Sequence, residues 1–247
     1  MAVLNINNLD LIRLEDNSTM IKDISLNINA GEVVLLSGRN GIGKTTFIDA
    51  LTNNLGSDRT SHAVFSGRYE IAGAAPDEKL FERVIYVPQQ DYISFPFVNV
   101  FRALLDGCPF PRKEAKEYVR KWISRYTPFT ANDNTLLKKR IGNLSGGEKK
   151  YIAIIQSVLR CDDSKIQLII LDEPINSLDS THVRLLSNLL LRIRDHNPQI
   201  GFLIVSHCHA FPYISSVYEI KDNKLVPGTY CQGTCFGDVD NKGYYLV

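Results

Sequence analysis

Short unbroken apolar runs recur along the chain, each ending near glycine, proline or acidic residues. The four clearest cover residues 32–37, 84–87, 165–171 and 202–205. Runs of this length fit strands buried on both faces, as in a parallel sheet. Residues 3–11 and 24–28 instead alternate apolar and polar side chains, which predicts two strands with one exposed face. Residues 64–71, interrupted at Gly67, predict a further strand pair beside them.

Helical periodicity fills the intervals between several of these strands. The expected helices cover residues 47–52, 115–126, 144–160 and 183–193. Alternating strands and helices predict an α/β fold whose ligands gather at the carboxyl ends of a parallel core sheet. We expect one domain over residues 1–247, with an antiparallel β subdomain, an inserted helical subdomain at about 91–143, and a terminal β segment at about 228–247. Trp122 is expected in the core of the helical insert.

The composition of the chain argues against direct nucleic-acid binding and against a membrane-spanning segment. The 247 residues carry a net charge of +1, which gives no basic footprint for direct nucleic-acid binding. No apolar run approaches the roughly 18–20 residues needed to span a bilayer, so we expect any membrane crossing to belong to another chain. The N-terminus has no signal-peptide layout. Five cysteines are too few and too scattered for a disulfide framework. Cys231 and Cys235 are expected to be free thiols, with part of a metal or redox site as the alternative.

The sequence G-x-x-x-x-G-K-T at residues 38–45 stands between a predicted strand and a predicted helix. In that context its glycines let backbone N–H groups surround a phosphate at the positive end of a helix. Lys44 is expected to reach the β- and γ-phosphates, and the Thr45 hydroxyl to help hold Mg²⁺. The expected nucleotide-binding residues here are Gly38, Arg39, Asn40, Gly41, Ile42, Gly43, Lys44, Thr45 and Thr46.

Polar side chains follow the other buried strands. Asp172 ends the run at 165–171 and is suited to hold Mg²⁺, while Glu173 is a candidate general base for an attacking water. His207 follows the run at 202–205 and would hydrogen-bond the γ-phosphate. Gln89 follows the run at 84–87 and would touch the metal or the water. A structural role for His207 and an ordinary turn at Gln89 are the alternatives.

Taken in order, these motifs resemble the nucleotide-binding subunit of ABC-type ATPases over about residues 3–224. The matching motifs are the P-loop at 38–45, Gln89, the signature at 144–148, the acidic pair Asp172 and Glu173, the loop 177–179 and His207. The resemblance implies ATP and Mg²⁺ as cofactors, ATP hydrolysis, and pairing with a second copy or a homologous subunit. It also implies ATP contacts from Ser145, Gly146, Gly147, Glu148 and Asp179. The signature residues would contact the ATP that is bound by the partner subunit.

The resemblance further implies a separate polytopic membrane subunit and a location on the cytoplasmic face of the bacterial inner membrane. The aromatic stretch 91–97 is a candidate docking surface for that subunit, with burial inside the insert as the alternative. The compactness of the chain resembles single-domain export subunits, so export of an antibacterial peptide or drug, as in self-immunity, is the expectation. Residues 100–111 resemble importers of iron chelates, which leaves import as the alternative. One alternative is a soluble ABC ATPase of an assembly scaffold such as iron–sulfur cluster biogenesis. Another, a purely structural or DNA-associated ABC protein, is disfavoured by the short insert and the near-neutral charge.

Three positions depart from the common family pattern. Residues 12–15 offer no aromatic ring to stack on adenine, so either Arg13 stacks on the base instead or the contact with the base is weak. Tyr151 stands where an arginine is common, and Cys208 where an aspartate is common. Loss of activity does not follow from either.

Overall fold

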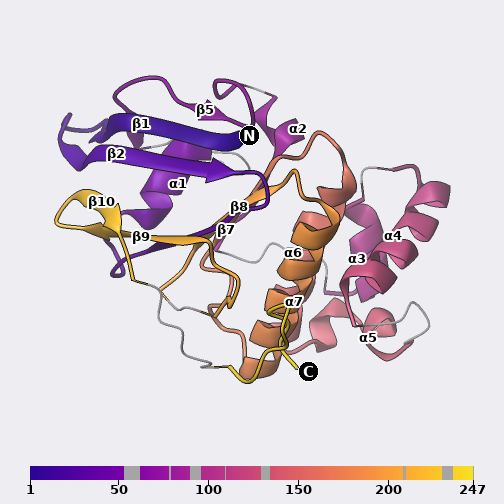
Figure 1. Cartoon of the computed structure of the whole chain (residues 1–247). Coiled ribbons are helices and arrows are strands. Elements are labelled where there is room, and N and C mark those ends of the chain that lie inside the picture. Colours follow the sequence, from indigo (N-terminus) through magenta and orange to yellow (C-terminus); the bar gives the residue numbers. More distant parts are fainter. Residues whose placement is uncertain are drawn as a thin grey trace.

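Among the residues that the computed structural model describes, the strands form one curved sheet (Figure 1). The described residues are 1–52, 62–77, 79–89, 96–108, 110–128, 134–207, 210–229 and 236–246. The strands are β1 Ala2–Arg13, β2 Thr19–Asn29, β3 Val33–Ser37, β4 Ala63–Phe65, β5 Glu70–Ile71, β6 Val84–Val87, β7 Leu168–Asp172, β8 Gly201–Val205, β9 Ser216–Lys221 and β10 Lys224–Pro227. Their order is β4-β1-β2-β10-β9-β3-β8-β7-β6, with β5 paired to β1.

The sheet has a parallel part and an antiparallel part. Strands β9, β3, β8, β7 and β6 pair in parallel, and β7 and β8 are buried along their whole length. Strand β1 pairs antiparallel with β2, β4 and β5. Burial on both faces explains the unbroken apolar runs of the parallel strands. The predicted α/β fold, with a parallel core sheet and an antiparallel β subdomain, is confirmed.

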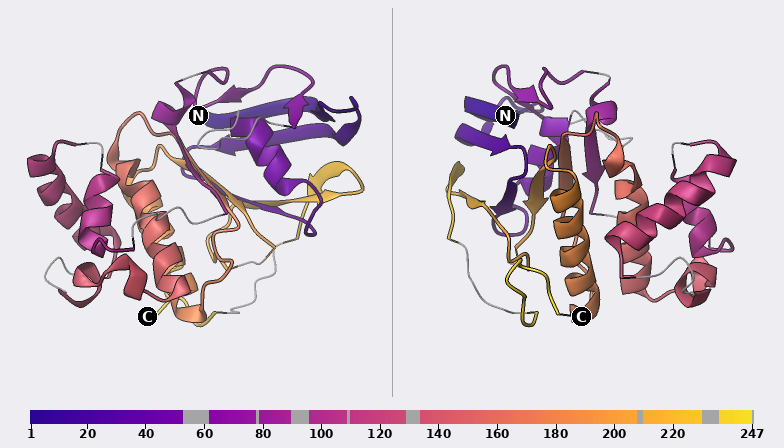
Figure 2. Two further views of the ribbon diagram at one scale, coloured as in Figure 1. Left: turned by 180° about the vertical axis from the view of Figure 1, so that it is seen from behind. Right: turned by 45° about the vertical axis from the view of Figure 1, so that its right-hand side comes forward.

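The helices divide into two groups. They are α1 Lys44–Thr52, α2 Leu80–Arg83, α3 Val100–Asp106, α4 Arg112–Tyr126, α5 Asn134–Lys138, α6 Gly146–Val158 and α7 Ser180–His196. Helices α6 and α7 lie beside the parallel strands, and α3, α4 and α5 form a separate layer beyond α6 (Figures 1 and 2). In that layer the Trp122 side chain is 1% exposed, and its ring centroid is 4.8 Å from that of Tyr126. Trp122 is therefore a core residue of the helical layer, as predicted.

Some elements were not predicted. These are β9, β10 and the helices α2, α3 and α5. The expected strand at 165–171 begins only at Leu168, because Ile166 donates its N–H to the carbonyl of Asp163 in a turn. Part of the expected terminal β segment lies outside the described residues, and its described part has one isolated bridge between Val239 and Tyr245.

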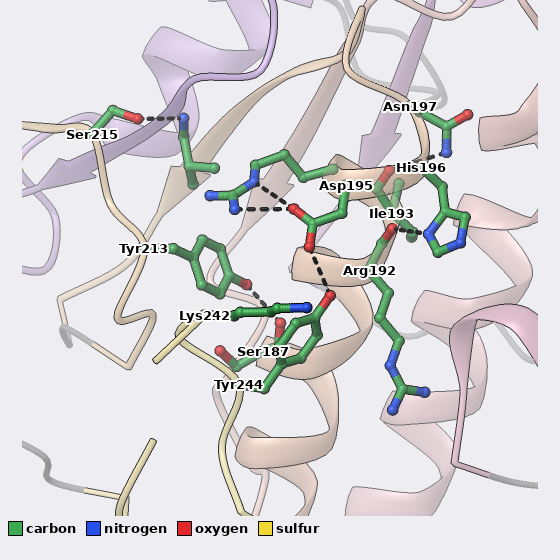
Figure 3. Close-up of polar contacts among 12 residues, drawn as sticks. Ser187, Arg192, Ile193, Asp195, His196, Asn197, Tyr213, Ser215, Lys242 and Tyr244 are labelled. Carbon is green, nitrogen blue, oxygen red and sulfur yellow. Dashed lines mark hydrogen bonds and ion pairs between the residues drawn. The ribbon is translucent and has the colours of Figure 1, made fainter. Parts of the chain in front are cut away.

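The terminal segment, residues 236–246, lies along α7. The Tyr245 backbone exchanges two hydrogen bonds with the buried Asn188 side chain, at 2.7 and 2.8 Å. The Tyr244 hydroxyl donates to Asp195 at 2.8 Å, as Figure 3 shows. Backbone and side-chain bonds together fix this segment to the helix. Among the described helices, none has the length and apolar character needed to span a bilayer.

Candidate functional site

The loop between β3 and α1 has the backbone of a phosphate cradle. Gly38, Gly41 and Gly43 have φ angles of +145°, +78° and +107°, a region that residues with a side chain rarely adopt. At Gly38 a Cβ would also lie 3.3 Å from the carbonyl oxygen of Ile220. Conformation and space therefore both call for glycine at the first position of the motif.

A cleft of about 410 Å³ opens over this loop. Its lining residues are Asn40, Gly41, Gly43, Lys44, Thr45, Thr46, Gln89, Glu173 and Asn176. The cleft thus brings the P-loop together with the two strand-end residues Gln89 and Glu173, as expected for one site. Asn176 was not predicted to belong to it, although its position between Glu173 and the 177–179 loop was an available signal. No signature residue, 144–148, is among the described residues that line the cleft.

Lys44 is buried at the floor of the cleft. Its Nζ donates to the carbonyls of Gly38 and Arg39 at 2.8 and 3.3 Å, and lies 3.4 Å from Oε1 of Glu173. Both charged side chains are 7% exposed. A buried charge needs such a partner because isolating it from water is costly. The ammonium is therefore held where phosphate oxygens would replace its present acceptors.

Two of the three predicted metal ligands, Thr45 and Asp172, are in direct contact. The Thr45 hydroxyl donates to Oδ2 of Asp172 at 3.0 Å, while Oδ1 is buried without a hydrogen-bond partner among the described residues. Burial raises the pKa of Asp172 to about 6, and the nearby Glu173 carboxylate adds to the rise. An unpartnered carboxylate oxygen beside a hydroxyl fits Mg²⁺, which needs only one or two protein carboxylates when phosphates supply other ligands. The described residues contain no larger cluster of His, Cys, Asp and Glu that would hold a metal.

Glu173 and His207 meet at the carboxyl ends of β7 and β8. Nδ1 of His207 lies 3.1 Å from Oε2 of Glu173, and because a carboxylate only accepts, Nδ1 carries the proton. The Glu173 backbone has φ +46°, which is left-handed for a residue with a side chain, and its N–H donates to the carbonyl of Val205 at 2.8 Å. The carboxylate is thus held between Lys44 and His207, at the edge of the cleft.

The signature begins helix α6. The Ser145 side chain accepts the Glu148 N–H, and the Glu148 carboxylate accepts the Ser145 N–H, which together form a capping box. A Cβ on Gly146 would meet nothing within 4 Å, so this end of the helix faces open space. A Cβ on Gly147 would lie 3.6 Å from Oδ2 of Asp179. The signature and the 177–179 loop are therefore neighbours on one surface.

Other residues named from the sequence are either absent from the cleft lining or outside the described residues. The Asp179 side chain caps helix α7 and lies 2.8 Å from His182 Nδ1, while still 60% exposed. Arg13, a candidate adenine contact, pairs with Asp16 at 3.5 Å. Tyr151 is buried. Of the aromatic stretch 91–97, residues 91–95 lie outside the described residues and Phe97 is 84% exposed. Cys208, Cys231 and Cys235 also lie outside the described residues.

Comparisons with known proteins agree with this geometry. Residues 21–176 match the family model described as ABC transporter. The putative ABC transporter ATP-binding protein CA_C0773 of Clostridium acetobutylicum is 32% identical, over 82% of this chain and 81% of that protein. The lipoprotein-releasing system ATP-binding protein LolD of Buchnera aphidicola is 26% identical, over 84% and 88%. The molybdate/tungstate import ATP-binding protein WtpC of Pyrococcus horikoshii is 28% identical over 77% of this chain.

The chain spans about half the length of WtpC, 51%, and of a spermidine/putrescine import ATP-binding protein PotA from Fusobacterium nucleatum, 48%. Among solved structures, cbiO1 from Clostridium perfringens superposes with a TM-score of 0.72 and 24% identity, covering 91% of this chain and 87% of that one. At that identity the superposition supports the fold. Since the family model covers more than half of the sequence, the chain belongs to the ABC transporter family, as an ATP-binding domain of the kind that hydrolyses ATP.

Proposed function

We propose that this chain is the ATP-hydrolysing subunit that powers an ABC transporter through ATP-driven pairing of two copies. The observation that carries the proposal is a divided site. The cleft is lined by Lys44, Gln89 and Glu173, whereas Gly146, at the open N-terminal end of α6, is not part of its described lining. A helix N-terminus favours anions. A second copy facing the cleft would bring that end against the exposed phosphates.

Within each site, named residues have distinct tasks. Lys44 exchanges its loop carbonyls and Glu173 for phosphate oxygens, which releases the Glu173 carboxylate to take a proton from the attacking water. His207 holds that carboxylate in position through its Nδ1 proton. Mg²⁺, held by Asp172, Thr45 and Gln89, would supply charge compensation for the phosphates.

The pairing is tested with a Glu173→Gln variant, which keeps the size of the side chain and removes the base. With ATP and Mg²⁺ this variant should elute as a dimer by size-exclusion chromatography with light scattering, and as a monomer without nucleotide. The matched control is the double variant that adds Lys44→Ala, which should stay monomeric. A Glu173→Gln protein that remains monomeric at saturating ATP would contradict the proposal.

We also propose a separate polytopic membrane subunit as partner. The support comes from the relatives: WtpC and PotA are named import ATP-binding proteins, LolD belongs to a lipoprotein-releasing system, and cbiO1 is described as part of the complex cbiONQ. These names include import, so export of an antibacterial peptide or drug stays a prediction from the sequence. The proposed location is the cytoplasmic face of the membrane.

Purification of the tagged chain from detergent-solubilised membranes tests the partner. A polytopic protein that co-purifies in stoichiometric amount supports transport, and ATP-dependent uptake of its substrate into inside-out vesicles would establish export. Recovery of a scaffold protein from the aqueous fraction, with no membrane protein, would favour the assembly ATPase instead.

A further inference from the structure

A buried lysine outside the predicted site joins three of its motifs. Lys150 lies on α6, two residues after the signature, and its side chain is 4% exposed. Its Nζ donates to the carbonyl oxygen of Glu173 at 3.2 Å and to that of Gln89 at 3.3 Å. One ammonium therefore contacts the backbone of both strand-end residues that line the nucleotide cleft.

Burying a lysine ammonium lowers the stability of the folded state. Removing an ammonium from water has a large cost, which its hydrogen bonds in the folded chain must offset. An apolar residue on the buried face of α6 would avoid that cost, as its neighbours Ile152, Ile154 and Ile155 do. The position of the charge therefore points to a role in the geometry of the site rather than in stability alone.

The contact with Glu173 fixes the backbone from which the catalytic carboxylate extends. On one side of the residue, the N–H donates to Val205 on β8, and on the other the carbonyl accepts from Lys150. Between these anchors lies the left-handed φ of +46°. A strained conformation persists when its surroundings hold it. Without Lys150, the Glu173 carbonyl keeps its 3.2 Å hydrogen bond from the Asn176 N–H but loses the charged donor, and the carboxylate has more directions available.

The contact with Gln89 ties this backbone to the neighbouring strand. Strands β6 and β7 pair in parallel, with Val87 opposite Leu171, so Gln89 and Glu173 follow adjacent strand ends. Beyond those ends the strand pairing stops, and the Lys150 ammonium bridges the two segments there. A displacement of Gln89 would therefore act on Glu173 through a single charged group.

We propose that Lys150 is a positioning residue for hydrolysis: it holds the Glu173 backbone in register with the Gln89 segment, so that the carboxylate meets the attacking water only when both are in place. The inference rests on the proposed ATPase function. It concerns how the base is oriented, and it is independent of what the transporter moves.

The test compares Lys150→Met, which removes the donors but keeps an unbranched side chain, with Lys150→Gln, which keeps an N–H donor. Lys150→Met should lower kcat for ATP hydrolysis about 10- to 100-fold, the effect expected of a misplaced catalytic group. The Kd for ATP should change less than about threefold, because the P-loop contacts are untouched. Lys150→Gln should recover part of kcat. Lys116→Met, the same change at an exposed position of α4, should behave like the unmodified protein.

Amide hydrogen exchange provides a readout that does not need hydrolysis. In the nucleotide-free protein, Lys150→Met should accelerate exchange in residues 172–178, while exchange in β3 stays unchanged. If the unmodified chain hydrolyses no ATP, the proposed function fails and the exchange result alone decides the role of Lys150. Hydrolysis within twofold of the unmodified protein overturns the inference. Equal losses of kcat and ATP affinity also overturn it. If the methionine variant does not fold, the same comparison of kcat with the Kd for ATP is made on the glutamine variant.

Discussion

The buried carboxylate of Asp172 leads to a prediction about stability in the absence of metal. Its side chain is 1% exposed, and burial raises its pKa from 3.8 to about 6. We predict that Asp172→Asn, which keeps an oxygen to accept the Thr45 hydroxyl, stabilises the metal-free protein while weakening its binding of Mg²⁺. The same charge that destabilises the empty site is the one that the cation needs.

The magnitude follows from the pKa difference between the folded and unfolded chains. At about 1.4 kcal/mol per unit, a rise from 3.8 to about 6 costs the folded state about 3 kcal/mol above pH 6. The cost is absent well below pH 3.8, where both states are protonated, and grows as pH rises from there to about 6, because in that interval the folded state binds more protons. For a domain of this size, about 3 kcal/mol corresponds to roughly 6–12 °C in Tm.

The assay is thermal unfolding of both proteins in excess EDTA, followed by circular dichroism at pH 5.0 and pH 7.5. The asparagine variant should melt above the unmodified protein at pH 7.5, and the gap should shrink to about half at pH 5.0. Adding Mg²⁺ with ATP should reverse the order at pH 7.5. An asparagine variant that melts at or below the unmodified protein in EDTA, or a gap equal at both pH values, would refute the reasoning.

Three further predictions concern packing and helix ends. Trp122→Ala should lower the free energy of unfolding in urea by about 3–5 kcal/mol, because the ring is 1% exposed; a loss below 1 kcal/mol would contradict its place in the core. Asn188→Ala removes both hydrogen bonds to Tyr245 and should expose residues 236–246 to limited proteolysis, at a cost of about 1–3 kcal/mol. Unchanged cleavage there would mean that other contacts hold the segment. Ser145→Ala removes the α6 cap and should cost about 1 kcal/mol and weaken ATP-driven pairing, so full pairing would remove Ser145 from the proposed interface.

The sequence predicted the buried strands well because two-sided burial leaves continuous apolar runs, as in β7 and β8. It did not predict β9 or β10. In β9 only Val217 and Ile220 are buried, between exposed ends, and β10 has no buried residue. Strand β9 pairs with the edge of β3, and β10 lies between β9 and β2, so both strands depend on partners that only the tertiary structure brings beside them.

For the site, motif spacing predicted which residues gather, since parallel strands end at one edge of the sheet. It did not predict the contacts among them. Lys44 and Glu173 are 129 positions apart, and no periodicity relates them. Lys150 was missed for the same reason. A lysine in a helix is normally expected on the surface, and only the folded arrangement of the neighbouring strands shows that this one is buried.

The ion pair between Lys44 and Glu173 has a consequence for the idle protein. A free and oriented Glu173 carboxylate could accept a proton from water before any nucleotide has bound. In this structure the Glu173 carboxylate is paired with Lys44, the lysine that is expected to bind the phosphates. The carboxylate is therefore not available as a base until a polyphosphate binds Lys44 in its place. A ligand with a single phosphate has no β- or γ-phosphate to reach Lys44 and would leave the ion pair intact, so the site would distinguish nucleoside monophosphates from polyphosphates before any partner is engaged.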